Sequence, residues 1–269
     1  MAKITFMGAG STVFVRNVLG DCMCREALKD SHFALYDIDG QRLKESEFIL
    51  KTLNANINEN RATITTHLGV ENRKEALRGA DFVVNAIQVG GYEPSTVIDF
   101  EIPKKFGLRQ TIADTLGIGG IFRALRELPE VLRIADDVRR LAPNAWLINF
   151  VNPTSTLGIG LMRHAPSVRS FALCDGNHEP YVRAMYLNKL GIIHDEEEFT
   201  PEVDAKFELK IAGVNHCTWI LECRYDGRDL LPLLLEKTRE AARHEYDHAP
   251  SPKAKPRLNA NYELALMEL

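Results

Sequence analysis

Short runs of apolar and β-branched residues alternate with longer stretches of mixed character along the first 173 residues. The runs lie at 4–7, 31–37, 62–66, 81–87, 145–151 and 170–173. Runs of this length are typical of strands that are buried on both faces of a parallel sheet. The stretches between them have helical spacing of their apolar residues, at 13–19, 40–56, 72–77, 117–140 and 154–164. The pattern therefore predicts an α/β fold with a doubly wound parallel sheet of the Rossmann type.

The same spacing predicts which faces of two helices are buried. In the helix at 40–56, the apolar face is expected to carry Leu43, Phe48, Ile49 and Leu53. In the long helix at 117–140, the arginines are expected on the outer faces.

After residue 175 the alternation of strands and helices changes. The elements predicted there are a charged loop at 196–202, strands at 205–211 and 216–225, a helix at 230–244 and the start of a helix at 262–269. These are too few to close a second core of ordinary size. We therefore expect a nucleotide-binding Rossmann domain at 1–173 and the start of a smaller α+β domain, for metal and substrate, at 174–269.

Composition adds constraints on partners and location. The chain has 269 residues, of which 45% are hydrophobic and 26% charged, with a formal net charge of -4. This balance gives no indication of a nucleic-acid or membrane partner. No apolar run approaches the roughly 20 residues that span a bilayer, and a signal-peptide pattern is absent. Five cysteines without a framework spacing indicate reduced thiols. We expect a cytoplasmic enzyme that forms a homo-oligomer, a dimer or tetramer.

The first strand leads directly into a glycine turn that is typical of dinucleotide binding. Gly8 permits a tight turn, and Gly10 allows the backbone to approach a pyrophosphate at the helix N-terminus. Ser11 or Thr12 is expected to cap this helix and to donate to a phosphate. Val13 occupies the position of the usual third glycine, so a purely structural turn is the alternative.

The second strand ends in an acidic residue that supports the nucleotide interpretation. Asp37 follows Gly10 by 27 residues, which is about where a Rossmann unit places the carboxylate that binds the adenosine ribose. The alternative is a turn residue before Gly40. With both features in order we expect NAD, because a carboxylate at this position disfavours the 2′-phosphate of NADP.

Amide side chains occupy the ends of two later strands. Asn85 lies within the apolar run at 81–87, and Asn149 and Asn152 flank the end of the run at 145–151. We expect Asn85 and Asn149 to contact the cofactor and Asn152 to bind substrate. An Asn-Pro turn at 152–153 is the simpler alternative.

Two further sets of residues are candidates for chemistry. Cys174 and His216 each follow a predicted strand or begin one, and a thiolate and an imidazole could hold a divalent metal with open positions for substrate. The alternative is a buried cysteine and a core histidine. Glycine-rich loops at 90–92 and 114–120, with Asp114 as a substrate ligand, predict a lid; flexible connections are the alternative.

Several of these segments occur together in a known order. KITFMGAGST, NAIQVGGYEP, TIADTLGIGGIFRALR, NFVNPTS, LCDGN and GVNH resemble the segments of glycoside hydrolase family four, NAD- and manganese-dependent glycosidases, over practically the whole chain. The resemblance is strongest to melibiase-like α-galactosidases and α-glucosidases. Members of the family continue well over a hundred residues past position 269, so the resemblance implies that the C-terminal part is missing and that the chain is either poorly active or supported by a partner chain.

The resemblance implies a redox-assisted mechanism that differs from the paired-carboxylate scheme of most glycosidases. NAD would take hydride from C3 of the sugar, a tyrosine would remove the C2 proton, the glycosidic oxygen would leave from C1, water would add and hydride would return. Cys174 and His216 match the ligands of Mn²⁺ or another divalent metal, which acts as a Lewis acid. Tyr262 matches the base and Asp175 the general acid.

The sugar is the least constrained part of this prediction. The residue after the metal cysteine varies with substrate, and Asp175 is typical of members that act on phosphorylated α-glucosides. We expect small non-phosphorylated α-galactosides or α-glucosides. The alternatives are 6-phospho-α-glucosides, α-galacturonides, a malate- or lactate-type dehydrogenase that shares the opening fold, and an inactive chain that only binds NAD.

Overall fold

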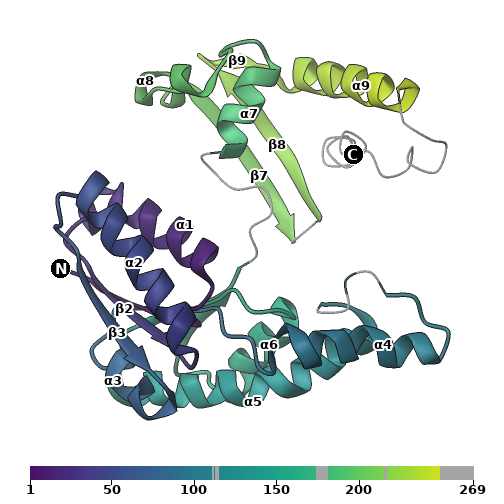
Figure 1. Ribbon diagram of the computed structural model, residues 1–269. Helices are drawn as coiled ribbons and strands as arrows, with labels where there is room; N and C mark the ends of the chain where they lie inside the picture. Colours follow the sequence, from purple (N-terminus) through teal and green to yellow (C-terminus); the bar gives the residue numbers. More distant parts are fainter. Residues whose placement is uncertain (111, 113–114, 174–180, 215–216, 249–269) are drawn as a thin grey trace. The chain divides into compact units, whose positions relative to one another are not determined.

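The computed structural model describes the whole chain except residues 111, 113–114, 174–180, 215–216 and 249–269. The chain divides into two compact units, Met1–Cys174 and Asp175–Leu269 (Figure 1). Each unit is described by itself.

The first unit is built on one parallel sheet of six strands. The strands are β1 (Lys3–Met7), β2 (His32–Asp37), β3 (Thr63–Leu68), β4 (Phe82–Asn85), β5 (Trp146–Asn149) and β6 (Arg169–Ala172). Their order in the sheet is β3-β2-β1-β4-β5-β6, and every neighbouring pair is parallel. The predicted Rossmann sheet is therefore confirmed. The strand order reverses between β1 and β4, and such a switch point is where open α/β sheets bind ligands.

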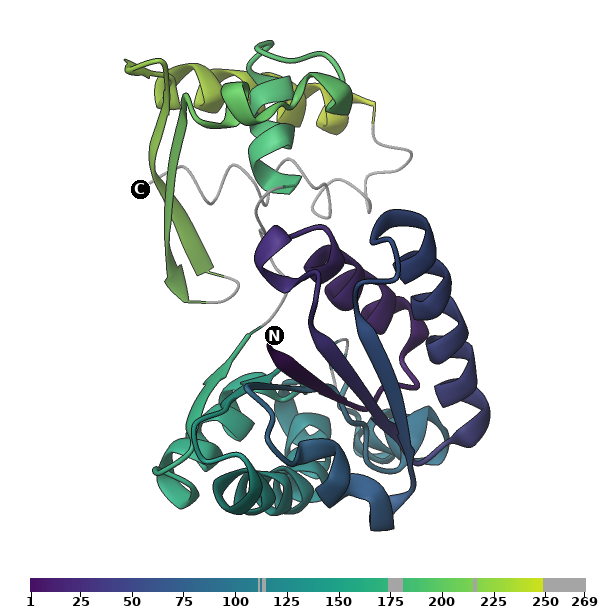
Figure 2. The ribbon, with the colours of Figure 1, turned by 90° about the vertical axis from the view of Figure 1, so that its left-hand side faces the viewer.

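Helices cover both faces of this sheet (Figures 1 and 2). On one face lie α1 (Thr12–Met23) and α2 (Gly40–Ile57), which share a core with the sheet; it includes Phe6, Val15, Leu19, Phe33, Leu35, Leu43 and Leu50. On the other face lie α3 (Arg73–Leu77), α5 (Gly117–Leu141) and α6 (Thr154–His164); that core includes Met7, Leu77, Val83, Val131, Val138, Leu147 and Leu157. Successive strand residues point to opposite faces, so each strand contributes to both cores.

The buried face of α2 differs from the predicted one. Its buried residues are Leu43, Ser46, Leu50 and Asn54, whereas Phe48 is 73% exposed. Two polar residues are buried on this face because their side chains form hydrogen bonds to the backbone. The Ser46 hydroxyl donates to the carbonyl of Ala9 at 2.5 Å, and the Asn54 amide donates to the carbonyl of Ala62 at 2.8 Å. Hydrophobicity alone therefore placed Leu43 and Leu53 on this face correctly, but it also put the exposed Phe48 there.

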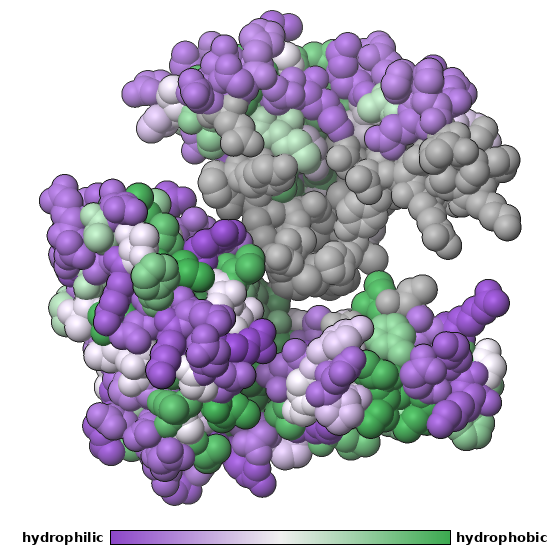
Figure 3. All heavy atoms as spheres, in the orientation of Figure 1, coloured by the Kyte–Doolittle hydropathy of each residue, from purple (hydrophilic) through white to green (hydrophobic). Residues whose placement is uncertain are grey.

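Residues 91–105, between β4 and α5, are helical, although the sequence predicted no helix there. A π-helical segment, Gly91–Thr96, leads directly into α4 (Val97–Lys105). The buried residues of α4 are Asp99 and Pro103, so no apolar stripe marks it in the sequence. Apolar side chains are exposed here instead and gather over α4 and the first turns of α5 (Figure 3); they include Ile98, Ile102, Phe106, Ile118, Ile121 and Leu125.

The second unit packs a small antiparallel sheet against helices. It contains α7 (Tyr181–Lys189), α8 (Pro201–Asp204), β7 (Phe207–Val214), β8 (Cys217–Tyr225), β9 (Arg228–Asp229) and α9 (Leu231–Asp247). Its core includes Val182, Tyr186, Leu187, Phe207, Ile220 and Leu234. The predicted loop at 196–202 is partly helical, because Thr200 caps α8 through a hydrogen bond to the Val203 N–H. The predicted helix at 262–269 lies outside the described residues.

No helix among the described residues is long and apolar enough to cross a membrane.

Candidate cofactor and substrate site

The turn after β1 approaches the backbone of the segment that follows β4 so closely that only glycine fits. Gly8 has a φ of +86°, and its N–H donates to the carbonyl of Tyr36 at 3.0 Å. A Cβ atom at Gly8 would lie 2.4 Å from the carbonyl oxygen of Ala86, well inside van der Waals contact. The turn is thus fixed at the switch point of the sheet by both conformation and contact.

The carboxylate of Asp37 lies against this turn. Its Oδ2 accepts the N–H of Gly10 at 2.6 Å, and its Oδ1 accepts the N–H of Asp39 at 2.9 Å. A Cβ at Gly10 would lie 2.8 Å from Oδ2, so a larger residue would displace the carboxylate. The structure therefore brings together Gly10 and Asp37, which the sequence paired for binding the nucleotide. Each carboxylate oxygen keeps capacity for a further donor, such as a ribose hydroxyl.

The helix that follows the turn presents its N-terminus near this carboxylate. Ser11 occupies the N-cap position of α1, but neither it nor Thr12 forms the expected side-chain cap. The first turn of α1 carries no acidic residue. Such a helix N-terminus favours an anion, and the phosphate role of Ser11 and Thr12 stays a prediction.

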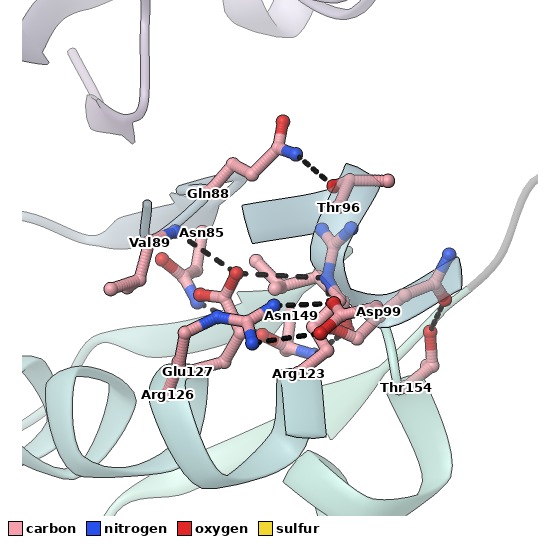
Figure 4. A network of polar contacts seen from close by, with 12 residues as sticks. Asn85, Gln88, Val89, Thr96, Asp99, Arg123, Arg126, Glu127, Asn149 and Thr154 are labelled. Atoms are coloured by element: carbon pink, nitrogen blue, oxygen red, sulfur yellow. Dashed lines mark hydrogen bonds and ion pairs between the residues drawn. The ribbon is translucent and has the colours of Figure 1, made fainter. Parts of the chain in front are cut away.

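Asn85 and Asn149 are partners across the adjoining strands β4 and β5. They are opposite each other in the register, and the Asn85 amide donates to Asn149 Oδ1 at 2.9 Å (Figure 4). Asn149 in turn donates to the carbonyl of Val151 at 3.0 Å. Both side chains are fully buried, and Asn85 Oδ1 has no hydrogen-bond partner among the described residues. The pair joins the carboxyl end of β4, which borders the switch point, to that of β5.

Asn152 lies in the segment after β5, at a cis peptide bond to Pro153. Its Oδ1 accepts the hydroxyl of Thr154 at 2.8 Å, and its carbonyl accepts Nε of Arg123 at 3.0 Å. The amide thus belongs to a local turn, as the alternative interpretation expected, and lies at the same sheet edge as Asn85 and Asn149.

A group of charged residues that the sequence did not predict lies beside these amides (Figure 4). Arg126 forms two hydrogen bonds to the fully buried carboxylate of Asp99, at 2.9 and 2.5 Å. Glu127 is also fully buried, and its Oε1 accepts the N–H of Val89 at 3.0 Å. Arg123 and Arg126 therefore point toward the protein, so the expectation that the arginines of this helix lie on its outer faces was wrong for these two.

Electrostatics in this group follow from burial. Removal from water raises the pKa of Glu127 to about 7, although the Val89 N–H and the guanidinium groups of Arg123 and Arg126 oppose the shift. The carboxylate of Asp99 raises the pKa of Arg126 and keeps it charged. A signal for Glu127 was present in the sequence: it lies within the helical stripe formed by Ala124, Val131, Ile134 and Val138.

The other predicted site residues lie outside the described residues; they are Asp114, Cys174, Asp175, His216 and Tyr262. Within the described part of the chain, no group of three or more histidine, cysteine, aspartate or glutamate side chains is arranged to hold a metal.

Comparison with known proteins gives matches along most of the chain. Residues 3–193 match the family described as Family 4 glycosyl hydrolase, and residues 211–266 match its C-terminal domain. An α-galactosidase of Bacillus subtilis (strain 168) is 48% identical over 241 residues, which cover 89% of this chain and 52% of that protein. An α-galacturonidase of Thermoanaerobacter italicus is 31% identical over 231 residues, which cover 86% of this chain and 48% of that protein.

A solved structure gives the same picture for the fold. The structure of a 6-phospho-α-glucosidase from gut microorganisms, in complex with NAD and Mn²⁺, matches with a TM-score of 0.68 at 22% identity. The match covers 89% of this chain and 51% of that one. The chain thus spans about half the length of the relatives that it matches.

Proposed function

Because the chain belongs to family 4 of the glycosyl hydrolases, we propose that it serves an NAD- and Mn²⁺-dependent α-glycosidase that acts on small, non-phosphorylated α-galactosides. The observation that carries the substrate is the 48% identity to an α-galactosidase, against 31% to an α-galacturonidase. α-Glucosides are the next candidates, since an α-glucosidase of Erwinia rhapontici is 32% identical.

The first unit fits NAD through its own residues. Gly8 and Gly10 form the tight turn before the N-terminus of α1, where backbone N–H groups and the helix dipole would favour the negative charge of a pyrophosphate. Asp37 accepts the hydroxyls of the adenosine ribose and repels a 2′-phosphate. Asn85 and Asn149 shape the sheet edge at which the nicotinamide half lies. When bound, NAD⁺ supplies a hydride acceptor for C3 of the sugar.

Six further residues complete the proposed site. Cys174 and His216 hold the metal, which supplies Lewis acidity to the sugar oxygens. Tyr262 takes the C2 proton, and a nearby cation is needed to lower its pKa from the ordinary value of about 10. Asp175 protonates the leaving oxygen, and Asn152 and Asp114 bind sugar hydroxyls.

Alternatives within the family concern the sugar. Asp175 beside the metal cysteine supports a 6-phospho-α-glucoside, and the α-galacturonidase relatives support a uronide. A malate- or lactate-type dehydrogenase is less well supported, because the family match extends over residues 3–193. A homo-oligomer and a cytoplasmic location remain predictions.

The direct test is hydrolysis of p-nitrophenyl α-D-galactopyranoside by the purified chain. We expect release of p-nitrophenol only when NAD⁺, Mn²⁺ and a thiol reductant are all present. The α-glucoside, α-galacturonide and 6-phospho-α-glucoside, assayed in parallel, identify the sugar. Release that is independent of NAD⁺ would contradict the proposal, and a preference for the phosphorylated sugar would reassign the substrate.

A further inference from the structure

The middle of α5 carries a carboxyl group where its neighbours are apolar. Glu127 is fully buried in the stripe that α5 packs against the sheet, between Ala124 and Val131. Burial of a carboxyl group costs free energy that hydrogen bonds and ion pairs only partly offset. An apolar side chain would therefore be the stabilising choice at this position. The hydrogen bond that Glu127 accepts from Val89 shows what it holds: the segment that follows β4.

One turn earlier on the same helix, Arg123 holds the neighbouring segment. Its Nε donates to the carbonyl of Asn152, which follows β5, and lies 3.6 Å from Oε1 of Glu127. Arg123 and Glu127, at i and i+4 on one helix, thus connect Asn152 to Val89. The bond between Glu127 and Val89 can be followed in Figure 4.

These two segments leave the sheet from adjacent strands. Asn85 of β4 and Asn149 of β5 are joined by their amides, and the chain reaches Val89 and Asn152 within four residues of them. The spacing between the two segments therefore depends on the sheet at one end and on Glu127 and Arg123 at the other.

We propose that Glu127 is a positioning residue that fixes the segment after β4 against the segment after β5, and so shapes the place where the nicotinamide half of NAD binds. This inference rests on the proposed function, because it takes NAD as the ligand of this sheet edge. Glu127 does not touch the adenosine half, which binds at Gly10 and Asp37 on the other side of β1.

The protonation state of Glu127 then affects cofactor binding. Its pKa of about 7 makes both forms available near neutral pH. The charged groups that act on it are Arg123 and Arg126 of α5, and Asp99 of α4 engages Arg126. An ionised carboxylate is a stronger acceptor for the Val89 N–H than a protonated one. The segment after β4 is therefore held more firmly, and NAD⁺ binds more tightly, as pH rises through about 7.

The test compares Glu127→Gln, which keeps the size and one acceptor but cannot ionise, with the unaltered chain. Glu101→Gln is the matched control, because Glu101 is exposed and pairs only with Lys104 among the described contacts. Calorimetry measures the affinity for NAD⁺ and for ADP, which lacks the nicotinamide half, at pH 6 and pH 8. We expect the unaltered chain and the control to bind NAD⁺ about tenfold more tightly at pH 8, the difference between a charge-assisted and a neutral hydrogen bond. Glu127→Gln should bind NAD⁺ with the same affinity at pH 6 and pH 8, and this affinity should equal that of the unaltered chain at pH 6.

A second measurement separates positioning from general stability. Amide exchange of Val89 should become faster in Glu127→Ala, but not in Glu101→Gln, while ADP affinity stays the same in all variants. An equal loss of ADP and NAD⁺ affinity, or a pH step that persists in Glu127→Gln, would overturn the role of Glu127. NAD⁺ binding with unchanged Val89 exchange in Glu127→Ala would overturn it as well. Absence of NAD⁺ binding from the unaltered chain would contradict the proposed function itself.

Discussion

Replacement of Gly8 by alanine tests how tightly the glycine turn is pressed against the sheet. Two costs add at this position. The φ of +86° disfavours any L side chain by about 1–2 kcal/mol. The new Cβ would also lie 2.4 Å from the carbonyl oxygen of Ala86, whose backbone cannot easily move away because its N–H donates to the carbonyl of Met7 at 2.8 Å. Overpacking of this kind typically costs about 1–3 kcal/mol more, for a total of about 2–5 kcal/mol.

Gly79 provides a matched control for the conformational part alone. Its φ is +67°, and no atom lies within 4 Å of a Cβ built there. Gly79→Ala should therefore cost only about 1–2 kcal/mol. The difference of about 1–3 kcal/mol between the two variants measures the close approach of the turn to the segment after β4.

Urea unfolding followed by tryptophan fluorescence is the assay. The chain has two tryptophans, Trp146 in the first unit and Trp219 in the second. In a Trp219→Phe background, the signal of Trp146 reports on the first unit alone, which avoids mixing two unfolding transitions. Equal destabilisation by Gly8→Ala and Gly79→Ala would refute the argument from steric contact.

Three further predictions concern charged and metal-binding residues. Glu127 has a pKa of about 7 in the folded chain, above the ordinary 4.5. The stability that it contributes is therefore fully present below pH 4.5, and the free energy of unfolding falls by about 3 kcal/mol as pH rises through 7. Urea unfolding between pH 5 and 8 should show this decrease, and Glu127→Gln should remove it. Asp99→Asn weakens the bidentate pair with Arg126, which is partly exposed, so a loss of about 2 kcal/mol in unfolding free energy is expected; a loss below measurement error would contradict the pairing. Cys174→Ser should reduce Mn²⁺ binding, measured by electron paramagnetic resonance, and abolish metal-dependent turnover while NAD⁺ affinity stays unchanged. Oxidation of the Cys174 thiol should inactivate the enzyme reversibly. Unchanged Mn²⁺ affinity in the serine variant would exclude Cys174 as a ligand.

The parallel sheet was predictable because its strands are short and buried on both faces, which leaves uninterrupted apolar runs such as 81–87. The pairing of Gly10 with Asp37 was predictable for a similar reason, since the order of strand, turn and helix fixes where the second strand ends. The buried face of α2 was only partly predictable from hydrophobicity, because Ser46 and Asn54 are buried for their hydrogen bonds to backbone.

The charged group around Glu127 was missed for a physical reason as well. In the sequence, a helical arginine that points into the protein cannot be told from one that faces solvent until its partner is known. The partner of Arg126 is Asp99, 27 residues away on a helix whose apolar residues are exposed. Only the fold brings these two together, whereas Glu127 was visible as a polar residue in an apolar stripe.

In the proposed function, the turn at Gly8–Gly10 and the carboxylate of Asp37 form an NAD site. Calorimetric titration of the purified chain with NAD⁺ and with NADP⁺ tests it most directly. We predict that NAD⁺ binds and that NADP⁺ binds at least about tenfold more weakly, because its 2′-phosphate meets a carboxylate at close range. Asp37→Asn should narrow this difference. Equal dissociation constants for the two nucleotides, or no binding of NAD⁺, would contradict the assignment.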